Sequence, residues 1–109
     1  MFISGGVNVY PAEIEAELLQ HGGVQDAAVV GVPDSTWGEV GVAFVVRRGP
    51  HGTTPEELAD FLGKRLARYK VPREFLFVDA LPRTAYGKVV KAELLKQYKD
   101  RRPSGPPLG

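Results

Sequence analysis

Two valine-rich stretches separated by a short polar loop constrain this chain more than any other feature. VQDAAVVGV covers residues 24–32 and is closed by Pro33-Asp34, and VGVAFVVR covers residues 40–47. Runs of this composition, bounded by turn residues, predict strands. The loop between them contains DSTWGE and is short enough for the strands to pair directly. We therefore expect an antiparallel hairpin with a functional loop at its tip.

Two helices have recognisable start and stop signals. The first is expected to start near Pro11, which suits the first helical position, and to stop at Gly22-Gly23. The second starts at the capping box Thr54-Pro55-Glu56-Glu57 and should continue until Pro72 disfavours helix at Val71. Residues at helical spacing predict the buried faces, which are Ile14 and Leu18 in the first helix and Leu58, Phe61, Leu62, Leu66 and Tyr69 in the second.

The second half adds one strand and one helix. EFLFVD (74–79) predicts a strand with Leu76 and Val78 on one face and Phe75 and Phe77 on the other. The polar turn PRTAYGK (82–88) leads into a short helix that carries Val90, Leu94 and Tyr98. The element order, roughly αββαβα after an N-terminal glycine turn, predicts a small α+β domain with helices packed on a three-stranded sheet. This domain covers residues 1–100, and the Pro/Gly-rich residues 101–109 are expected to be disordered.

Length and composition exclude several classes of protein. The 109 residues suffice for one small domain. No apolar run approaches the ~20 residues of a membrane span, and no secretory signal precedes the first turn. The absence of cysteine excludes disulfides, thiolate catalysis and cysteine zinc sites. The two histidines, His21 and His51, are far apart, so we expect a metal-free protein of the cytoplasm.

Charge is divided unevenly along the chain. Residues 1–63 hold two bases and nine acids, a net charge of −7, whereas residues 64–109 hold twelve bases and four acids, a net charge of +8. One interpretation is a solvated face with a basic tail. The other is that the second half meets an anionic partner such as phosphate groups. Nucleic acid is the weaker candidate, because the bases are not interleaved with aromatic residues.

Four segments of the sequence indicate a family when they are considered together. In order they are ISGGVNVYPAEIE, GVPDSTWGE, YKVP and LPRTAYGKVVK. Taken alone, the Ser-Gly-Gly turn and the Gly-Lys loop are each weak signals, and neither has the spacing of a P-loop. In this order and separation, across residues 1 to about 98, the segments resemble the C-terminal domain of the adenylate-forming (AMP-binding) enzymes. Within that superfamily the chain is most similar to bacterial fatty-acid or aromatic-acid acyl-CoA synthetases.

The resemblance assigns the first half-reaction to Lys88. In the family, the lysine of the last core motif enters the active site when a carboxylate attacks the α-phosphate of ATP. Two anions must then approach each other, and a charged ammonium can contact both. The resemblance implies that Gly87 belongs to the ligand-binding loop and gives it freedom to deliver the lysine, and that Thr84 is the hydroxyl position of the same motif.

The resemblance assigns the second half-reaction to a different face. Ser4, Gly5 and Gly6 would line the channel that admits the pantetheine arm of CoA, since glycines let a thin arm pass close to the backbone. Trp37 matches a position that contacts CoA in some relatives. Tyr69 and Lys70 match a segment that contacts the CoA nucleotide. Val71 follows where some relatives carry arginine, so Lys70 or Arg73 would have to supply the phosphate contact.

The family's larger N-terminal domain, which holds ATP with its magnesium and the acyl tunnel, has no counterpart in this sequence. The resemblance therefore predicts a fragment that begins just after the hinge, partners the missing domain, and is inactive alone. The predicted function is part of an ATP-dependent acyl-CoA synthetase acting on a small-molecule carboxylic acid, ATP and CoA. Two alternatives stay open: an adenylation domain that loads a carrier protein, and a stand-alone nucleotide-binding or regulatory module without catalysis.

Overall fold

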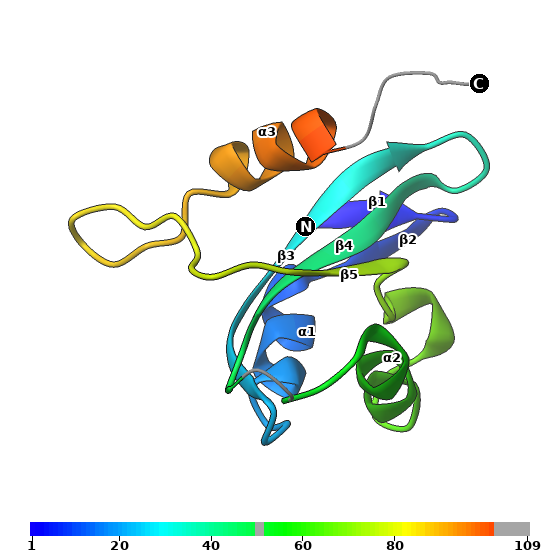
Figure 1. Cartoon of the computed structure of the whole chain (residues 1–109). Helices are drawn as coiled ribbons and strands as arrows, with labels where there is room; N and C mark the ends of the chain where they lie inside the picture. The colour runs from blue at the N-terminus through cyan, green and yellow to red at the C-terminus, as the bar shows by residue number, and fades with distance from the viewer. Residues whose placement is uncertain (50–51, 102–109) are drawn as a thin grey trace.

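A computed structural model describes residues 1–49 and 52–101 of the chain (Figure 1). Its elements are β1 (Phe2–Ser4), β2 (Val7–Val9), α1 (Pro11–Leu18), β3 (Val24–Asp34), β4 (Gly38–Arg47), α2 (Pro55–Gly63), the 3-10 turn η1 (Arg68–Lys70), β5 (Glu74–Phe77) and α3 (Lys91–Arg101). The predicted α+β class is confirmed. No helix in the described part of the chain is long and apolar enough to cross a membrane.

The predicted hairpin forms the centre of the sheet. β3 and β4 pair antiparallel from Val24 opposite Arg47 to Asp34 opposite Gly38, with one register irregularity between Val24 and Asp26. Helices cover both faces of these strands, with α1 and α2 on one side and α3 on the other (Figure 1). This double burial explains why both strands read as nearly continuous apolar runs.

Alternation along the strands divides the core in two. One cluster, beneath α1 and α2, contains Ala27, Val29, Ala43 and Val45 together with the fully buried helical residues Ile14, Leu18, Leu58 and Leu62. The other, beneath α3, contains Ala28, Val30, Val42 and Phe44 together with Leu94. The predicted faces of the third strand are confirmed, since Phe75 and Phe77 pack in the first cluster and Leu76 and Val78 in the second.

The expectation of three strands was too low. The sheet has five strands, because the N-terminal glycine turn is the tip of a hairpin formed by β1 and β2. β1 joins the sheet where Ser4 pairs with Gly38 at the start of β4, and β5 runs parallel to β4 further along the same edge. Three-residue strands are too short to show a period of two, so their pairing is set by tertiary contacts.

The helix starts are confirmed, but both predicted ends were too late. α1 ends at Leu18, four residues before Gly22, and the second helix also ends early. The hydroxyl oxygen of Thr54 accepts a hydrogen bond from the backbone N–H of Glu57 (3.2 Å), as the capping box requires. α2 ends at Gly63, eight residues before Val71, because glycine in a helix interior is unfavourable. Tyr69 consequently lies on η1, where it is exposed and not part of a buried helical face.

The C-terminal helix is confirmed, with Leu94 as its buried anchor, but it begins at Lys91, so Val90 precedes it. Helical structure continues through Arg101, the first residue of the predicted tail. The rest of that tail, residues 102–109, lies outside the described residues.

Part of the charge asymmetry is used within the molecule. Each of five ion pairs joins an acid from residues 1–63 to a base from residues 64–109. The pairs are Asp60–Lys64, Glu17–Arg65, Glu13–Lys70, Asp26–Arg83 and Glu15–Lys91. Three of the acids, Glu13, Glu15 and Glu17, are alternate residues of α1, and their partners lie in η1, in α3 and in the segment just after α2. Intramolecular pairing in the described part of the chain therefore engages five of the twelve bases of residues 64–109, and Arg68, Arg73 and Lys88 are not among them.

Two candidate functional surfaces

Lys88 lies at the end of the loop at residues 82–88, and its side chain is exposed. Thr84 organises this loop. Its N–H donates to the carbonyl of Lys88 (2.8 Å), and its hydroxyl oxygen accepts from the N–H groups of Tyr86 (3.3 Å) and Lys88 (3.2 Å). The loop therefore fixes the backbone of the lysine while its ammonium remains accessible to a ligand.

Gly87 adopts a backbone conformation that few other residues allow. Its φ of +84° lies in the left-handed region, which favours glycine, and its carbonyl accepts a hydrogen bond from Arg83 (2.6 Å). Gly87 thus permits a particular bend that other contacts hold in place. The importance of Arg83 was not predicted from the sequence.

A groove of about 480 Å³ lies where β1, the start of β4 and η1 meet. Its lining residues are Ser4, Trp37, Val40, Gly41, Arg68, Tyr69, Val71 and Arg73. The structure therefore brings together three of the predicted CoA-contacting residues, Ser4, Trp37 and Tyr69. It adds the exposed side chains of Arg68 and Arg73, which give the groove lining a positive charge.

The hairpin tip between β3 and β4 holds Trp37 at the groove. The carboxylate of Asp34 accepts hydrogen bonds from the N–H groups of Thr36 (3.0 Å) and Trp37 (2.9 Å). The bond from Trp37 is the main cause that lowers the pKa of Asp34. The Trp37 carbonyl accepts from the N–H of Gly5 (2.8 Å), and the indole is about half exposed (49%). The loop is thus ordered, and one part of the indole stays available to a ligand.

Gly5 lies directly against the indole ring of Trp37. A Cβ on Gly5 would lie 2.8 Å from Cε3 of Trp37, whereas one on Gly6 would meet nothing within 4 Å. Both glycines have positive φ, +58° and +81°. Within the domain, the group that lies close to this turn is the Trp37 ring. Neither glycine is among the residues that line the groove.

Lys70, the other residue of the predicted CoA-nucleotide segment, is paired with an acid of α1. Its ammonium lies 2.9 Å from a carboxylate oxygen of Glu13 on α1, and this hydrogen-bonded contact raises the pKa of Lys70. The ammonium is 5.8 Å from the centre of the Tyr69 ring but does not line the groove. Of the two bases considered for the phosphate contact, Arg73 is therefore the one in the groove.

The two surfaces lie at opposite ends of the molecule. In Figure 1 the loop at residues 82–88, drawn in yellow, extends away from the β1–β2 hairpin and from the segment between α2 and β5 that contains η1. In the described part of the chain there is no group of three or more His, Cys, Asp or Glu side chains that could hold a metal. The domain thus presents the exposed Lys88 at one end and an aromatic, basic groove at the other.

Comparison with known proteins identifies the class. The family model of the AMP-binding enzyme C-terminal domain matches residues 13–88. The 2-succinylbenzoate–CoA ligase of Geobacillus sp. (strain WCH70) is 50% identical over 94 residues, which are 86% of this chain and 19% of the relative. The long-chain-fatty-acid–CoA ligase FadD13 of Mycobacterium tuberculosis (strain ATCC 25618 / H37Rv) is 45% identical over 98 residues, 90% of this chain and 19% of the relative.

Solved structures agree with these sequence matches. The Mycobacterium tuberculosis fatty acyl CoA synthetase superposes with a TM-score of 0.88 and 44% identity, covering 94% of this chain and 20% of that chain. The chain belongs to the family of AMP-binding enzyme C-terminal domains. It spans about a fifth of the length of the curated relatives that it matches.

Proposed function

We propose that this chain acts as the C-terminal domain of an ATP-dependent acid–CoA ligase, supplying one surface to each of two half-reactions. The observation that carries the proposal is the separation of Lys88 from the groove that contains Trp37, Tyr69 and Arg73. Two sites at opposite ends of a small domain cannot both contact one reacting centre in a single orientation. A ligase that forms an acyl-adenylate and then a thioester would use them in turn.

In the proposed adenylation step, Lys88 acts on an acid and ATP held by a larger domain. The substrate carboxylate attacks the α-phosphate, forming the acyl-adenylate and releasing pyrophosphate. Negative charge accumulates on the phosphoryl oxygens, and the exposed ammonium of Lys88 would stabilise it. ATP would bring its magnesium to the larger domain.

In the proposed thioester-forming step, the groove faces the acyl-adenylate. The thiol of CoA, as its thiolate, attacks the acyl carbon and AMP leaves. The aromatic rings of Trp37 and Tyr69 would flank the pantetheine arm, with Gly5 supporting the indole. The guanidinium groups of Arg68 and Arg73 would meet the nucleotide phosphates, because arginine suits bidentate phosphate contacts.

Replacing Arg73 by alanine is expected to raise the KM for CoA by about tenfold, because a charge-assisted hydrogen bond in an exposed groove is worth about 1.5 kcal/mol. The measurement is steady-state thioester formation by the full-length ligase. Adenylation should be unchanged. Lys70→Ala is the matched control, since its ammonium is paired with Glu13, and it should have a smaller effect.

Using pantetheine in place of CoA as the acceptor tests whether Arg73 contacts the nucleotide phosphates. It lacks the nucleotide, so Arg73→Ala should not change its KM. An equal increase for pantetheine and CoA would contradict a phosphate contact at Arg73. An effect at Lys70 without one at Arg73 would transfer the contact to Lys70. If only a carrier-bound arm were accepted, the acceptor would be a carrier protein and not free CoA.

A further inference from the structure

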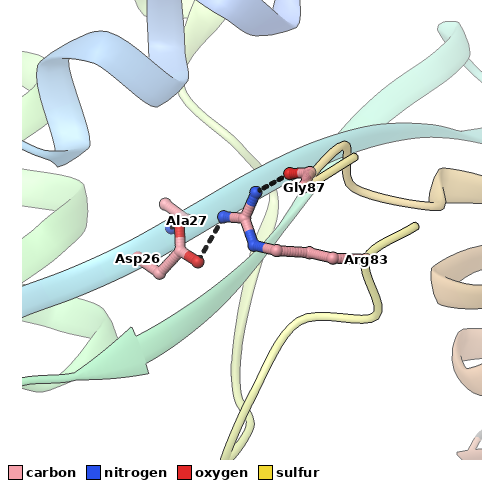
Figure 2. A network of polar contacts seen from close by, with 4 residues as sticks. All are labelled: Asp26, Ala27, Arg83 and Gly87. Atoms are coloured by element: carbon pink, nitrogen blue, oxygen red, sulfur yellow. Dashed lines mark hydrogen bonds and ion pairs between the residues drawn. The ribbon is translucent and has the colours of Figure 1, made fainter. Parts of the chain in front are cut away.

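One guanidinium joins the Lys88 loop to the central sheet (Figure 2). One terminal nitrogen of Arg83 donates to the carbonyl of Gly87 (2.6 Å), and the other donates to Oδ2 of Asp26 (2.5 Å). Asp26 and Arg83 are 57 residues apart in sequence. This contact therefore ties the loop to β3, an element that precedes it by half the chain.

The Asp26 end of this bridge is held rigidly. Asp26 lies in β3 at the register irregularity after Val24, and it pairs with Val46 of β4. Its second carboxylate oxygen accepts a hydrogen bond from the N–H of Ala27 (2.9 Å). Both oxygens of the carboxylate are thus engaged, and the strand that carries them is covered on both faces. Asp26 therefore holds the guanidinium of Arg83 at a defined position beside β3.

The Gly87 end acts directly on the peptide that leads into the lysine. The carbonyl of Gly87 and the N–H of Lys88 belong to one planar peptide unit. Arg83 holds the carbonyl side of this plane, and the Thr84 hydroxyl accepts from its N–H side (3.2 Å). Holding both sides of the plane fixes the direction in which the side chain of Lys88 leaves the backbone.

We propose that Arg83 is a positioning residue for Lys88 in adenylation, acting through the Gly87 carbonyl and braced by Asp26. This inference rests on the proposed function of Lys88. Arg83 does not need to contact a substrate. Its own side chain is 41% exposed and that of Asp26 is 29% exposed. An ion pair so exposed adds little to stability, so its contribution is to orientation.

The geometry requires arginine. The two nitrogens of the planar guanidinium reach two acceptors at once, whereas an ammonium on a flexible stem is a point charge without a fixed fork. Arg83→Lys keeps the positive charge and removes this double contact. It therefore separates an effect of charge from an effect of geometry.

The first test measures the loop in the 109-residue chain itself. We expect Arg83→Lys to increase fast motion and hydrogen exchange at the backbone amides of Gly87 and Lys88, observed by NMR relaxation and exchange. The thermal unfolding midpoint should stay unchanged. Arg65→Lys is the matched control, because Arg65 forms a similarly exposed pair with Glu17 (3.2 Å) and should leave the loop amides unchanged. Unaltered loop amides in Arg83→Lys would overturn the proposal.

The second test measures adenylation in the full-length ligase by ATP–pyrophosphate exchange. We expect Arg83→Lys to lower kcat by ~10–10²-fold, the cost of a displaced catalytic group, with the KM for ATP unchanged. Thioester formation from a preformed acyl-adenylate should be unchanged. Asp26→Leu should reproduce the loss, and Asp26→Asn, which keeps an accepting oxygen, should reduce it less.

The outcomes separate this inference from the function on which it rests. If Lys88→Ala leaves adenylation unchanged, the proposed function fails, and the loop measurement still decides whether Arg83 braces the loop. Suppose instead that Lys88→Ala abolishes adenylation. If Arg83→Lys then loosens the loop without slowing adenylation, the proposal that Arg83 positions Lys88 is wrong. Equal losses of both half-reactions in Arg83→Lys would also contradict it, because they would indicate general damage to the domain.

Discussion

Replacing Lys88 by alanine in the full-length ligase is expected to slow adenylation by ~10²–10³-fold, as loss of one preorganised electrostatic stabiliser does elsewhere. The physical reason is the charge that accumulates when a carboxylate attacks the α-phosphate. In the proposed function, the exposed ammonium of Lys88 is the group that meets that charge. ATP–pyrophosphate exchange measures the effect on this half-reaction alone.

Thioester formation from a preformed acyl-adenylate provides the internal control for this prediction, and it should keep its rate in Lys88→Ala. A second control is Lys91→Ala, which removes a nearby ammonium that is already paired with Glu15 (2.9 Å). It should leave adenylation unchanged. If Lys88→Ala impaired both half-reactions equally, or neither, the role proposed for Lys88 would be incorrect.

Replacing Gly23 by alanine is expected to destabilise the domain by about 3 kcal/mol, the upper part of the usual range for overpacking. A Cβ on Gly23 would lie 2.0 Å from the carbonyl oxygen of Gly52 and 2.6 Å from its carbon. These are backbone atoms, so relief requires the chain itself to shift. The Gly23 carbonyl also accepts from the N–H of Arg48 (2.8 Å), which such a shift would disturb. Urea unfolding followed by circular dichroism measures the change.

The neighbouring glycine is the matched control. A Cβ on Gly22 would meet nothing within 4 Å, so Gly22→Ala should leave the free energy of unfolding nearly unchanged. Both substitutions remove the same backbone freedom from the unfolded chain. A difference between them therefore reports the contact with Gly52. Equal unfolding free energies for the two variants would show that the segment accommodates the added methyl group.

The sequence predicted the elements that carry their own local signals. Proline at the first helical position, the Thr54 capping box and the valine-rich strands are each readable within ten residues, and each is present in the structure. The β1–β2 hairpin was missed because its strands are short and pair with β4 only at Ser4. The end of α2 was misplaced because the apolar spacing continues to Leu66, while Gly63 ends the helix.

The residues of the candidate site could likewise be predicted only where the sequence carries a recognisable local motif. A known motif order led to Lys88, Trp37 and Tyr69, and the groove unites the latter two. Arg73 was preferred to Lys70 as the phosphate-contacting residue because Lys70 is paired with Glu13, which is 57 residues away from it in the sequence. The bridge through Arg83 depended on Asp26 in the same way. Contacts between distant charged residues have no local sequence pattern, because they follow from how the sheet and helices pack.

The central claim is that the two ends of this domain serve different half-reactions. The most direct test measures both half-reactions of one full-length ligase in two variants, Lys88→Ala and Trp37→Ala. We predict that Lys88→Ala loses adenylation and retains thioester formation from a preformed acyl-adenylate. We predict the reverse for Trp37→Ala, with adenylation retained and thioester formation from CoA impaired. Loss of the same half-reaction in both variants would contradict the claim.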